Sequence, residues 1–401
     1  MSTSNSAGDP PAGDLSRRSF LALGAAGLAT VVLGCSDDGP ALSDDRRVIV
    51  IGAGPAGMTA AHHLVQRGID VQVLEAAPTH GGRIKHTRDF ADFPISLGGE
   101  WVHVGEGILD EIVNDPDVEI TTTLTRYDQD VDEVAYIAGG EVAYGPISDV
   151  FVVDSKFVGS SWLDFFETYV LPGIADRIEF DTVVTAVEIT DDGVTVTDAA
   201  GVGWEADQVV VTVPLKVLQR GDITFEPPLS EEKREAIAEA NVWSGLKAFI
   251  EFDEAFYPAA VAFAEDEEIV DGQRLYYDAA YGQDTDANIL GLFSVGVLAE
   301  RYQALTDDEL RAAMLAELDE AFDGAASRHY VRHIVQNWNE EPFAGAAYLW
   351  DNAPWRLTRR LASSVDGRLF FAGDAYTGFD DWSSVHAAAR SAVDAVEELL
   401  G

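Results

Sequence analysis

The sequence predicts an α/β protein in which a domain built on a parallel sheet is interleaved with a second domain of the α+β type. Two observations predict this architecture. The stretch 46–75 has the order strand, glycine turn, helix, strand, and apolar strand patterns return from Ile178 onward. With 401 residues the chain also exceeds the usual size of one hydrophobic core, so two domains are expected.

The N-terminal segment is expected to lie outside this fold. Arg17 and Arg18 precede an apolar run over 21–34 that is short for a membrane-spanning helix. This run resembles a twin-arginine export signal, and its end at Cys35 resembles a lipoprotein cleavage site at which the cysteine is lipidated. An uncleaved N-terminal anchor is the alternative. We expect a signal over 1–35, a linker over 36–45, and an exported protein that is lipid-anchored in the cell envelope or free in the periplasm or outside the cell.

The stretch 46–75 predicts a Rossmann-like dinucleotide-binding unit. Its first strand runs into a G-x-G-x-x-G turn at Gly52, Gly54 and Gly57. The first glycine permits a tight turn, the second lets backbone N–H groups approach a pyrophosphate, and the third lets the helix pack close to the strand. Glu75 ends the second strand, where a ribose hydroxyl needs an acceptor. A βαβ packing turn that binds no ligand is the alternative.

The chain is strongly acidic, with 70 acidic against 26 basic residues and a formal net charge of −44. Such a surface repels phosphate backbones, so nucleic-acid binding is not expected. The same surface suits either a high-salt environment or the steering of cationic substrates, and composition leaves both open.

Metal and serine-hydrolase chemistry are not expected. Cys35 is the only cysteine, so the chain forms neither an internal disulfide nor a thiolate cluster. His62 and His63 are adjacent and therefore point in different directions on a helix. The sequence contains no H-E-x-x-H motif and no G-x-S-x-G motif.

Two further glycine motifs make the prediction more specific. GGR at 81–83 combines close backbone approach with the donor fork of Arg83, and LGGEWVH at 97–103 leads from glycines into aromatic and titratable side chains. Together with the βαβ unit, these motifs resemble the flavin-containing amine oxidase family, which includes monoamine and polyamine oxidases. The resemblance covers nearly all of 46–401 and implies FAD, held in a domain of the glutathione-reductase type.

The resemblance also implies how the two domains divide the chain. The segment 106–175, which is more compact than in the family, is expected to hold short helices and a hairpin that turns at Gly139 and Gly140. Long helices are expected over 307–322 and 385–400. The expected FAD-binding segments are 46–105, 176–245 and 336–401, and the expected substrate-binding segments are 106–175 and 246–335.

Lysine is rare in this chain, and Lys247 lies in a predicted strand on the face opposite Leu246 and Ala248. In the family the lysine of the matching strand holds a water near flavin N5, and the resemblance implies that role here. The alternative is a solvent-facing lysine that pairs with Glu251 or Asp253.

The return segment of the chain bears on cofactor attachment and on substrate binding. Family members with a covalent flavin have a cysteine where this chain has Ala347, so non-covalent FAD is expected. Tyr348 matches an aromatic residue that sandwiches the substrate nitrogen, although a buried tyrosine with a hydrogen-bonded hydroxyl is the alternative. The second aromatic of that pair falls on Ser384 or Val385, so the pair is incomplete unless Trp382 supplies it.

The family pattern places the remaining site residues. An acid at Asp374 would face the ribityl hydroxyls of FAD, and the N-terminus of the last helix, capped by Ser384, would stabilise negative charge on the reduced ring. The predicted catalytic residues are Lys247 and Tyr348, and weaker substrate candidates are His103, Trp101 and Trp382. A satisfied structural histidine is the alternative for His103. The predicted FAD contacts are Gly52, Gly54, Ala56, Gly57, Glu75, Gly82, Arg83, Gly98, Gly99, Glu100, Trp101, Val184, Gly373, Asp374 and Val385.

The resemblance therefore implies FAD-dependent oxidation of a small-molecule amine, with hydride transfer from the α-carbon to flavin N5, imine hydrolysis, and reduction of O2 to H2O2. Two other functions stay open. One is a flavin desaturase or isomerase that acts on an apolar substrate. The other is an exported FAD lipoprotein that turns over nothing.

Overall fold

A computed structural model describes residues 46–350, 353–378 and 382–401. The described residues all belong to one compact unit. The predicted export signal, with Cys35, and the whole of the predicted linker lie outside the described residues.

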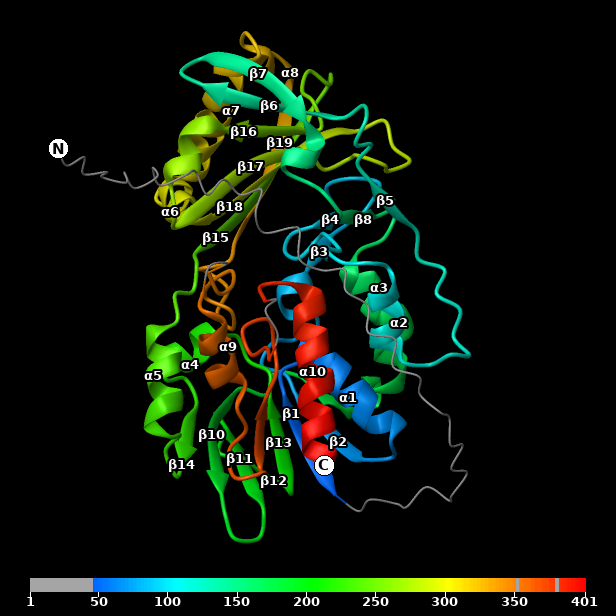
Figure 1. Cartoon of the computed structure of the whole chain (residues 1–401), viewed down its shortest axis with the longest axis vertical. Coiled ribbons are helices and arrows are strands. Elements are labelled where there is room, and N and C mark those ends of the chain that lie inside the picture. Colours follow the sequence, from blue (N-terminus) through cyan, green and yellow to red (C-terminus); the bar gives the residue numbers. More distant parts are fainter. Residues whose placement is uncertain (1–45, 351–352, 379–381) are drawn as a thin grey trace, which may run out of the picture. The chain divides into compact units, whose positions relative to one another are not determined.

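A five-stranded parallel sheet carries the glycine turn, in the order β20-β13-β1-β2-β9 (Figure 1). Its strands are short, and β13, β20 and all but the first residue of β1 are apolar or uncharged and buried, as expected inside a parallel sheet, whereas the edge strand β9 is partly exposed. Helices α1 (Pro55–Gln66) and α10 (Val385–Leu400) share a core with Val48 and Val50 on one face. The strands are β1 (Arg47–Ile51), β2 (Asp70–Leu74), β9 (Ile178–Glu179), β13 (Gln208–Val211) and β20 (Leu369–Phe371).

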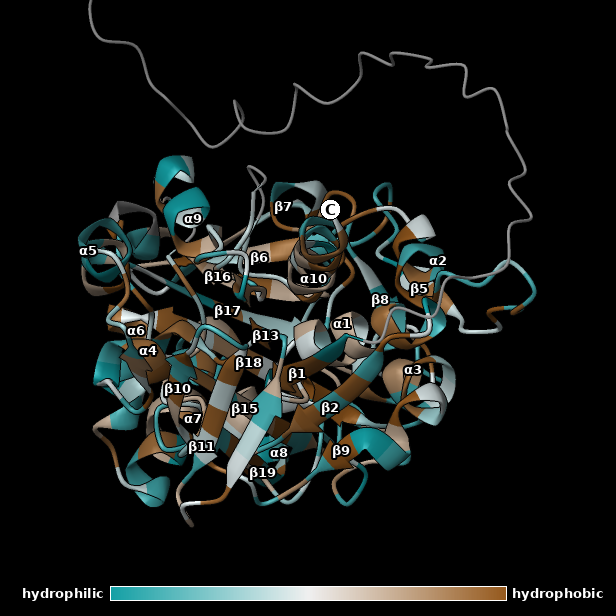
Figure 2. Cartoon of the chain, turned by 90° about the horizontal axis from the view of Figure 1, so that it is seen from below, coloured by the Kyte–Doolittle hydropathy of each residue, from teal (hydrophilic) through white to brown (hydrophobic). Residues whose placement is uncertain are grey.

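A four-stranded sheet covers the opposite face, where Ile49 and Ile51 share a core with Val187 and Val196. Its order is β12-β11-β10-β14. Figure 2 shows hydrophobic residues on the inner strands and hydrophilic ones on the outer helices α5 and α9. The elements of this layer are β10 (Val184–Ile189), β11 (Val194–Asp198), β12 (Gly203–Ala206), β14 (Thr224–Glu226), α4 (Leu215–Arg220), α5 (Glu231–Glu239) and α9 (Trp355–Ala362).

A seven-stranded sheet in the order β19-β15-β18-β17-β16-β6-β7 forms the second part of the fold (Figure 1). One face packs on α6, α7 and α8 through Leu290, Leu292 and Met314, and the other face carries Phe249 and Tyr277. The elements are β6 (Glu133–Ala138), β7 (Glu141–Pro146), β15 (Gly245–Phe252), β16 (Ala260–Phe263), β17 (Gly272–Asp278), β18 (Asn288–Gly296), β19 (Tyr330–Asn337), α6 (Val297–Gln303), α7 (Asp307–Ala321) and α8 (Ala325–His329).

The segment 106–175 is divided between these two parts. Helices α2 (Gly107–Val113) and α3 (Trp162–Tyr169) pack into the core beside α1, whereas β6 and β7 extend the seven-stranded sheet. The predicted hairpin and the two predicted long helices are therefore confirmed, and the predicted substrate segment contributes to both cores. Two small ladders pair β3 (His86–Thr87) with β4 (Ile95–Ser96) and β5 (Leu124–Arg126) with β8 (Ser155–Phe157). Single 3₁₀ turns cover Gly82–Ile84, Ile147–Asp149, Leu171–Gly173, Ala175–Arg177 and Ala264–Glu268.

His62 and His63 join α1 to the end of α2. Their Nε2 atoms bond the carbonyl oxygens of Val113 and Ile112 at 2.8 and 3.1 Å. Burial lowers the pKa of both imidazoles, that of His63 to about 4. Within the described residues no group of three histidine, cysteine or acidic side chains is arranged to hold a metal ion, and no helix is long and apolar enough to cross a membrane.

Candidate active site

The glycine turn leaves the start of α1 open to a ligand. Gly52 has a φ of +107°, and a Cβ there would lie 2.8 Å from Thr212 Oγ1. A Cβ on Gly57 would lie 1.9 Å from the Gly52 carbonyl oxygen, whereas one on Gly54 would meet nothing within 4 Å. Gly52 and Gly57 therefore permit close packing, and Gly54 borders open space at the positive end of the α1 dipole.

The Glu75 carboxylate is fixed at the end of β2. It accepts hydrogen bonds from the backbone N–H groups of Ala53, at 2.5 Å, and Ala77, at 2.8 Å. Burial raises the pKa of Glu75, and these two hydrogen bonds oppose the rise. The acid thus ties the second strand to the glycine turn and borders the same open space.

One continuous cavity of about 700 Å³ joins the glycine turn to the aromatic face of the seven-stranded sheet. Its size is that of a cofactor or ligand pocket. Gly57 lies beneath the turn and does not line the cavity. The predicted site residues that line it are Gly52, Gly54, Ala56, Glu75, Gly82, Arg83, Gly98, Gly99, Glu100, Trp101, His103, Val184, Lys247, Tyr348, Gly373, Asp374, Trp382 and Val385.

Arg83 and Asp374 form an ion pair in the cavity wall. The guanidinium donates to both carboxylate oxygens of Asp374 and to the Ala347 carbonyl oxygen. The Asp374 side chain is 11% exposed and that of Arg83 is 26% exposed. Arg83 was expected to donate to a phosphate, but in the structure it donates to Asp374, the acid expected to face the ribityl chain. Arg83 therefore fixes that carboxylate at the cavity.

Lys247 is buried on the cavity-facing side of β15. Its Nζ donates to Glu100 Oε2 at 2.8 Å and to the Ser96 carbonyl oxygen at 3.2 Å. The ammonium lies 5.1 Å from the Trp101 ring centroid and 5.5 Å from that of Tyr277. The alternative of a solvent-facing lysine paired with Glu251 or Asp253 is thus wrong, because the side chain is 4% exposed and pairs with Glu100.

Burial and the neighbouring charges have opposite effects on the pKa of Lys247. Burial lowers the pKa of Lys247, and the neighbouring Glu100 carboxylate raises it. Burial also disfavours ionised Glu100, but the two ammonium groups of Lys247 and Lys156 outweigh this effect and lower the pKa of Glu100. The Tyr277 hydroxyl donates to Glu100 as well, so the carboxylate is held by three side chains.

A half-exposed pair lies at another part of the cavity wall. His103 Nδ1 lies 2.5 Å from Asp154 Oδ1, and the His103 ring centroid is 6.2 Å from that of His386. The His103 side chain is 46% exposed, so this wall is open to solvent. His103 therefore lies at the cavity and has a carboxylate partner that satisfies its ring nitrogen.

Tyr348 and Trp382 both line the cavity. In the sequence, Tyr348 precedes the undescribed residues 351–352, and Trp382 follows the undescribed residues 379–381. The Tyr348 ring lies 6.1 Å from that of Trp243, and Trp382 Nε1 donates to the Trp350 carbonyl oxygen at 3.1 Å. Ser384 caps α10 by accepting from the Ala387 N–H at 3.1 Å, as predicted. The start of α10 thus borders the cavity at Val385.

Comparison with known proteins identifies the family. The model of flavin-containing amine oxidoreductases matches residues 174–400, and that of a NAD(P)-binding Rossmann-like domain matches residues 50–114. The first match alone spans more than half of the chain. The chain belongs to the flavin-containing amine oxidoreductase family.

Individual relatives of this chain are distant. Lysine-specific histone demethylase 1B of Mus musculus is 24% identical over 413 residues, which is 82% of this chain but 50% of that protein, so the chain spans about half of its length. Polyamine oxidase 4 of Oryza sativa subsp. japonica is 24% identical, with 88% of each chain covered. A solved putrescine oxidase bound to putrescine has the same fold, with a TM-score of 0.72 and 18% identity over 89% of this chain and 99% of that one.

FAD is the cofactor of this family, and the cavity fits it. The missing Cβ of Gly54 leaves room for a pyrophosphate at the start of α1, and Glu75 offers carboxylate oxygens for a ribose. Asp374 is the acid available for the ribityl hydroxyls.

Sequence reasoning missed several residues of this site. Lys156 lies 3.4 Å from Glu100 Oε1, Tyr277 donates to the same carboxylate, and Asp154 pairs with His103. Lysine is rare in this chain, so each lysine was worth considering, and this scarcity was a usable signal for Lys156. In the structure the residue is 3% exposed, and a lysine so buried needs a partner. No local pattern marks Tyr277 or Asp154.

Proposed function

We propose that this amine oxidase removes a hydride from the carbon beside the nitrogen of a small amine, leaving an imine that water hydrolyses while O2 is reduced to H2O2. FAD, when bound, supplies the hydride acceptor and returns the electrons to O2. The observation that carries the proposal is Lys247, a buried lysine in an aromatic wall of the cavity that also contains the dinucleotide cradle.

The chain's own residues would bind and orient the amine. Trp101 and Phe293 meet edge to face, with ring centroids 6.2 Å apart, and line the cavity with Tyr348. An apolar wall of this kind favours the neutral amine, which has the lone pair that the reaction needs, over its ammonium form. Lys247 Nζ would hold a water beside the reacting carbon.

We further propose that the substrate is a diamine or polyamine. The polyamine oxidases and the putrescine oxidase among the similar proteins support this class by name. The cavity wall supplies a suitable second contact, because the Asp154 carboxylate beside His103 could accept a hydrogen bond from a distal ammonium group.

The decisive experiment is anaerobic mixing of the FAD-loaded protein with diamines, polyamines, monoamines and amino acids, while the absorbance of oxidised flavin is followed. Bleaching by diamines or polyamines would support the proposal, and bleaching only by another class would replace the substrate assignment. Failure of every amine to bleach a flavin that dithionite still reduces would contradict amine oxidation.

We propose that FAD is held non-covalently. The support is Ala347, which stands where the resemblance places a cysteine in covalent flavoproteins and whose side chain lines the cavity. Acid precipitation should therefore leave all yellow colour in the supernatant. Flavin that stays on the precipitated polypeptide would contradict this attachment.

We also propose export by the twin-arginine route with lipidation of Cys35. The support is the sequence alone, and the segment lies outside the described residues. Labelling cells with a radioactive fatty acid should mark the wild-type chain and not Cys35→Ser. Export should stop in the double variant Arg17→Lys/Arg18→Lys.

A further inference from the structure

A second, much smaller cavity lies behind Glu100. Its volume is about 10 Å³, close to the roughly 10–15 Å³ that one water needs. Its polar lining comes from Ser96, Glu100, Lys156, Ser160 and Gln283, which provides the several partners that a buried water requires.

Among the described residues, Glu100 alone lines both this small cavity and the main cavity. Its carboxylate bonds Lys247 in the wall of the main cavity through Oε2, at 2.8 Å. Oε1 lies 3.4 Å from Nζ of Lys156, which lines the small cavity. The carboxylate therefore stands between the reaction site and the space for a water.

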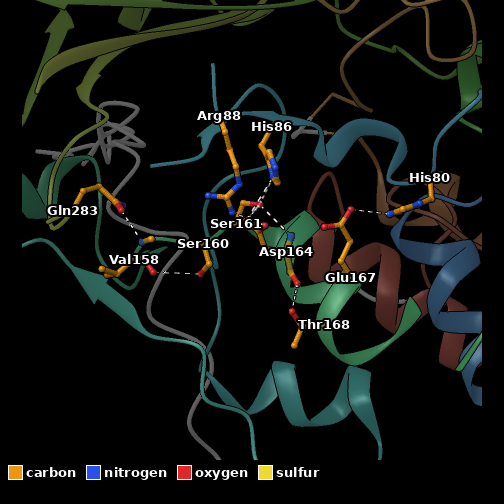
Figure 3. A network of polar contacts seen from close by, with 11 residues as sticks. His80, His86, Arg88, Val158, Ser160, Ser161, Asp164, Glu167, Thr168 and Gln283 are labelled. Atoms are coloured by element: carbon orange, nitrogen blue, oxygen red, sulfur yellow. Dashed lines mark hydrogen bonds and ion pairs between the residues drawn. The ribbon is translucent and has the colours of Figure 1, made fainter. Parts of the chain in front are cut away.

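The small cavity also reaches toward solvent. Ser160 and Gln283 are only half-buried, and Figure 3 shows them on either side of Val158, near the start of α3. Gln283 Oε1 accepts from the Gly159 N–H at 2.8 Å, and Ser160 lies next in the chain. A proton that reaches this cavity has a short polar route to the surface.

Amine oxidation creates a need for such a route. At neutral pH an aliphatic amine arrives as an ammonium ion, because its pKa is near that of lysine, about 10.4. It must lose a proton before a hydride can leave the neighbouring carbon. We propose that Glu100 is the proton carrier that passes this proton from Lys247 to water in the small cavity, and that Lys156 is the positioning residue that holds Glu100 between them.

The transfer balances without any other reactant. Glu100 first takes a proton from the Lys247 ammonium as an O–H bond forms, and releases it to water. The substrate N–H bond then breaks, its electron pair stays on nitrogen, and the neutral Lys247 left by the first step takes the proton. The net change is that R–NH3⁺ and H2O become R–NH2 and H3O⁺, with Lys247 and Glu100 restored.

Charged and titratable groups from several elements face this carboxylate. They are Lys247 from β15, Lys156 from β8, Tyr277 from β17, and Tyr127, whose pKa is raised by burial and by the Glu100 carboxylate. Burial also raises the pKa of Asp278 on β17, and the neighbouring Lys156 ammonium opposes that rise. Lys156 also donates to the carbonyl oxygens of Asp278 and Ala279, each at 3.0 Å, which fixes its ammonium. Lys156 thus has two fixed acceptors besides Glu100.

The first test follows the pH dependence of the flavin absorbance in the resting protein and needs no substrate. Glu100→Gln removes an anion from Lys247, so the midpoint of the step caused by Lys247 should fall by about one to three pH units. Lys156→Met removes a cation, so the same midpoint should rise. Equal midpoints in all variants, or shifts in the same direction for both substitutions, would overturn the proposal.

The chain offers a matched control in Lys233. Like Lys156, it is a buried lysine that donates to two backbone carbonyl oxygens, those of Leu361 and Ser363, but it does not line either cavity. Lys233→Met should leave the midpoint of Lys247 unchanged. A shift as large as that of Lys156→Met would assign the effect to loss of a buried lysine in general.

The second test measures anaerobic flavin reduction by an amine as a function of pH, and it rests on the proposed function. Glu100→Gln should slow reduction about 100-fold near pH 7 and far less near pH 10, where more of the amine arrives neutral. A loss that is equal at all pH values would overturn the carrier role. If wild type is reduced by no amine, the proposed function fails instead, and the absorbance titration still tests the carrier.

Glu100→Gln leaves two buried ammonium groups without their shared anion and could prevent folding. The double variant Glu100→Gln/Lys156→Met removes one charge of each sign. It is used in place of Glu100→Gln if that single variant does not fold. Its reduction rate should show the same pH-dependent loss. Wild-type rates at neutral pH in this variant would overturn the proposal.

Discussion

Lys156, Lys233 and Lys247 are each less than 5% exposed, which is uncommon for lysine. Their ammonium groups meet different partners. Lys247 bonds a carboxylate in the cavity, Lys156 bonds two carbonyl oxygens beside that carboxylate, and Lys233 bonds two carbonyl oxygens near the end of α9. Since burial of an unpaired charge is costly, the partners decide what each lysine can do.

Lys247→Met should slow flavin reduction or reoxidation by about 100-fold or more, because it removes the group proposed to hold a water and a proton at the reaction site. FAD should stay bound, since the dinucleotide cradle lies on other elements. Stopped-flow measurement of both half-reactions checks this, with Lys233→Met as the control. Unchanged rates for both half-reactions would remove Lys247 from the mechanism.

Lys233 should make stability depend on pH. Burial lowers its pKa from 10.5 to about 7. Between these values the unfolded chain binds a proton that the folded chain does not, so the free energy of unfolding rises with pH, by at most about 1.4 kcal/mol per unit. Below about pH 7 this contribution no longer changes.

Urea unfolding of wild type and Lys233→Met at several pH values isolates this effect as the difference between the two proteins. The free energy of unfolding of wild type minus that of Lys233→Met should increase from about pH 7 toward pH 10. A constant difference over that range would show that Lys233 keeps its proton when buried.

At the scale of elements, strand register decides which side chains meet in the cavity. Lys247 of β15 pairs with Phe293 of β18, and Tyr277 of β17 pairs with Gly291. A Cβ on Gly291 would lie 2.7 Å from the Tyr277 ring, so this glycine lets the ring cross β18 toward Glu100. A shift of one residue in any of these strands would turn the cavity side chains to the opposite face.

Two glycines of the turn before α1 should have different roles, Gly57 in folding and Gly54 in cofactor binding. Gly57→Ala places a methyl group 1.9 Å from the Gly52 carbonyl oxygen and should destabilise even the apoprotein by about 1–3 kcal/mol. Gly54→Ala meets no protein atom within 4 Å and should leave apoprotein stability unchanged while weakening FAD binding.

Thermal unfolding of the two apoproteins and FAD titration monitored by fluorescence test this contrast. Equal loss of apoprotein stability in both variants would show that Gly54 also has a packing role. Undiminished FAD affinity in Gly54→Ala would place the pyrophosphate elsewhere.

At the scale of the whole molecule, the net charge of −44 sets the response to salt. Like charges at the surface repel one another, and the Debye length falls from about 30 Å at 0.01 M to about 8 Å at 0.15 M salt. The unfolding midpoint should therefore rise over this range. The dependence of kcat/KM on salt for charged and neutral amines would separate steering from stabilisation, because steering weakens with salt only for charged substrates.

Local sequence signals predicted much of the fold and the cofactor side of the cavity. The glycine turn, Glu75 and the capped final helix each depend on residues near them in the chain, and the structure places them as expected. The groups around Glu100 could not be predicted in this way. Lys247 and Tyr277 reach Glu100 only through the pairing of distant strands. The residues next to Glu100 in the sequence therefore do not indicate its partners.

The parallel sheet draws its strands from both ends of the described chain. β1 begins at Arg47, β20 ends at Phe371, and α10 then packs beside α1 in the core. During synthesis on a ribosome, the early βαβ unit would emerge long before the strand and helix that complete its layer. The nascent polypeptide therefore cannot form the finished flavin pocket before β20 and α10 have emerged, and cofactor loading must wait for these two elements.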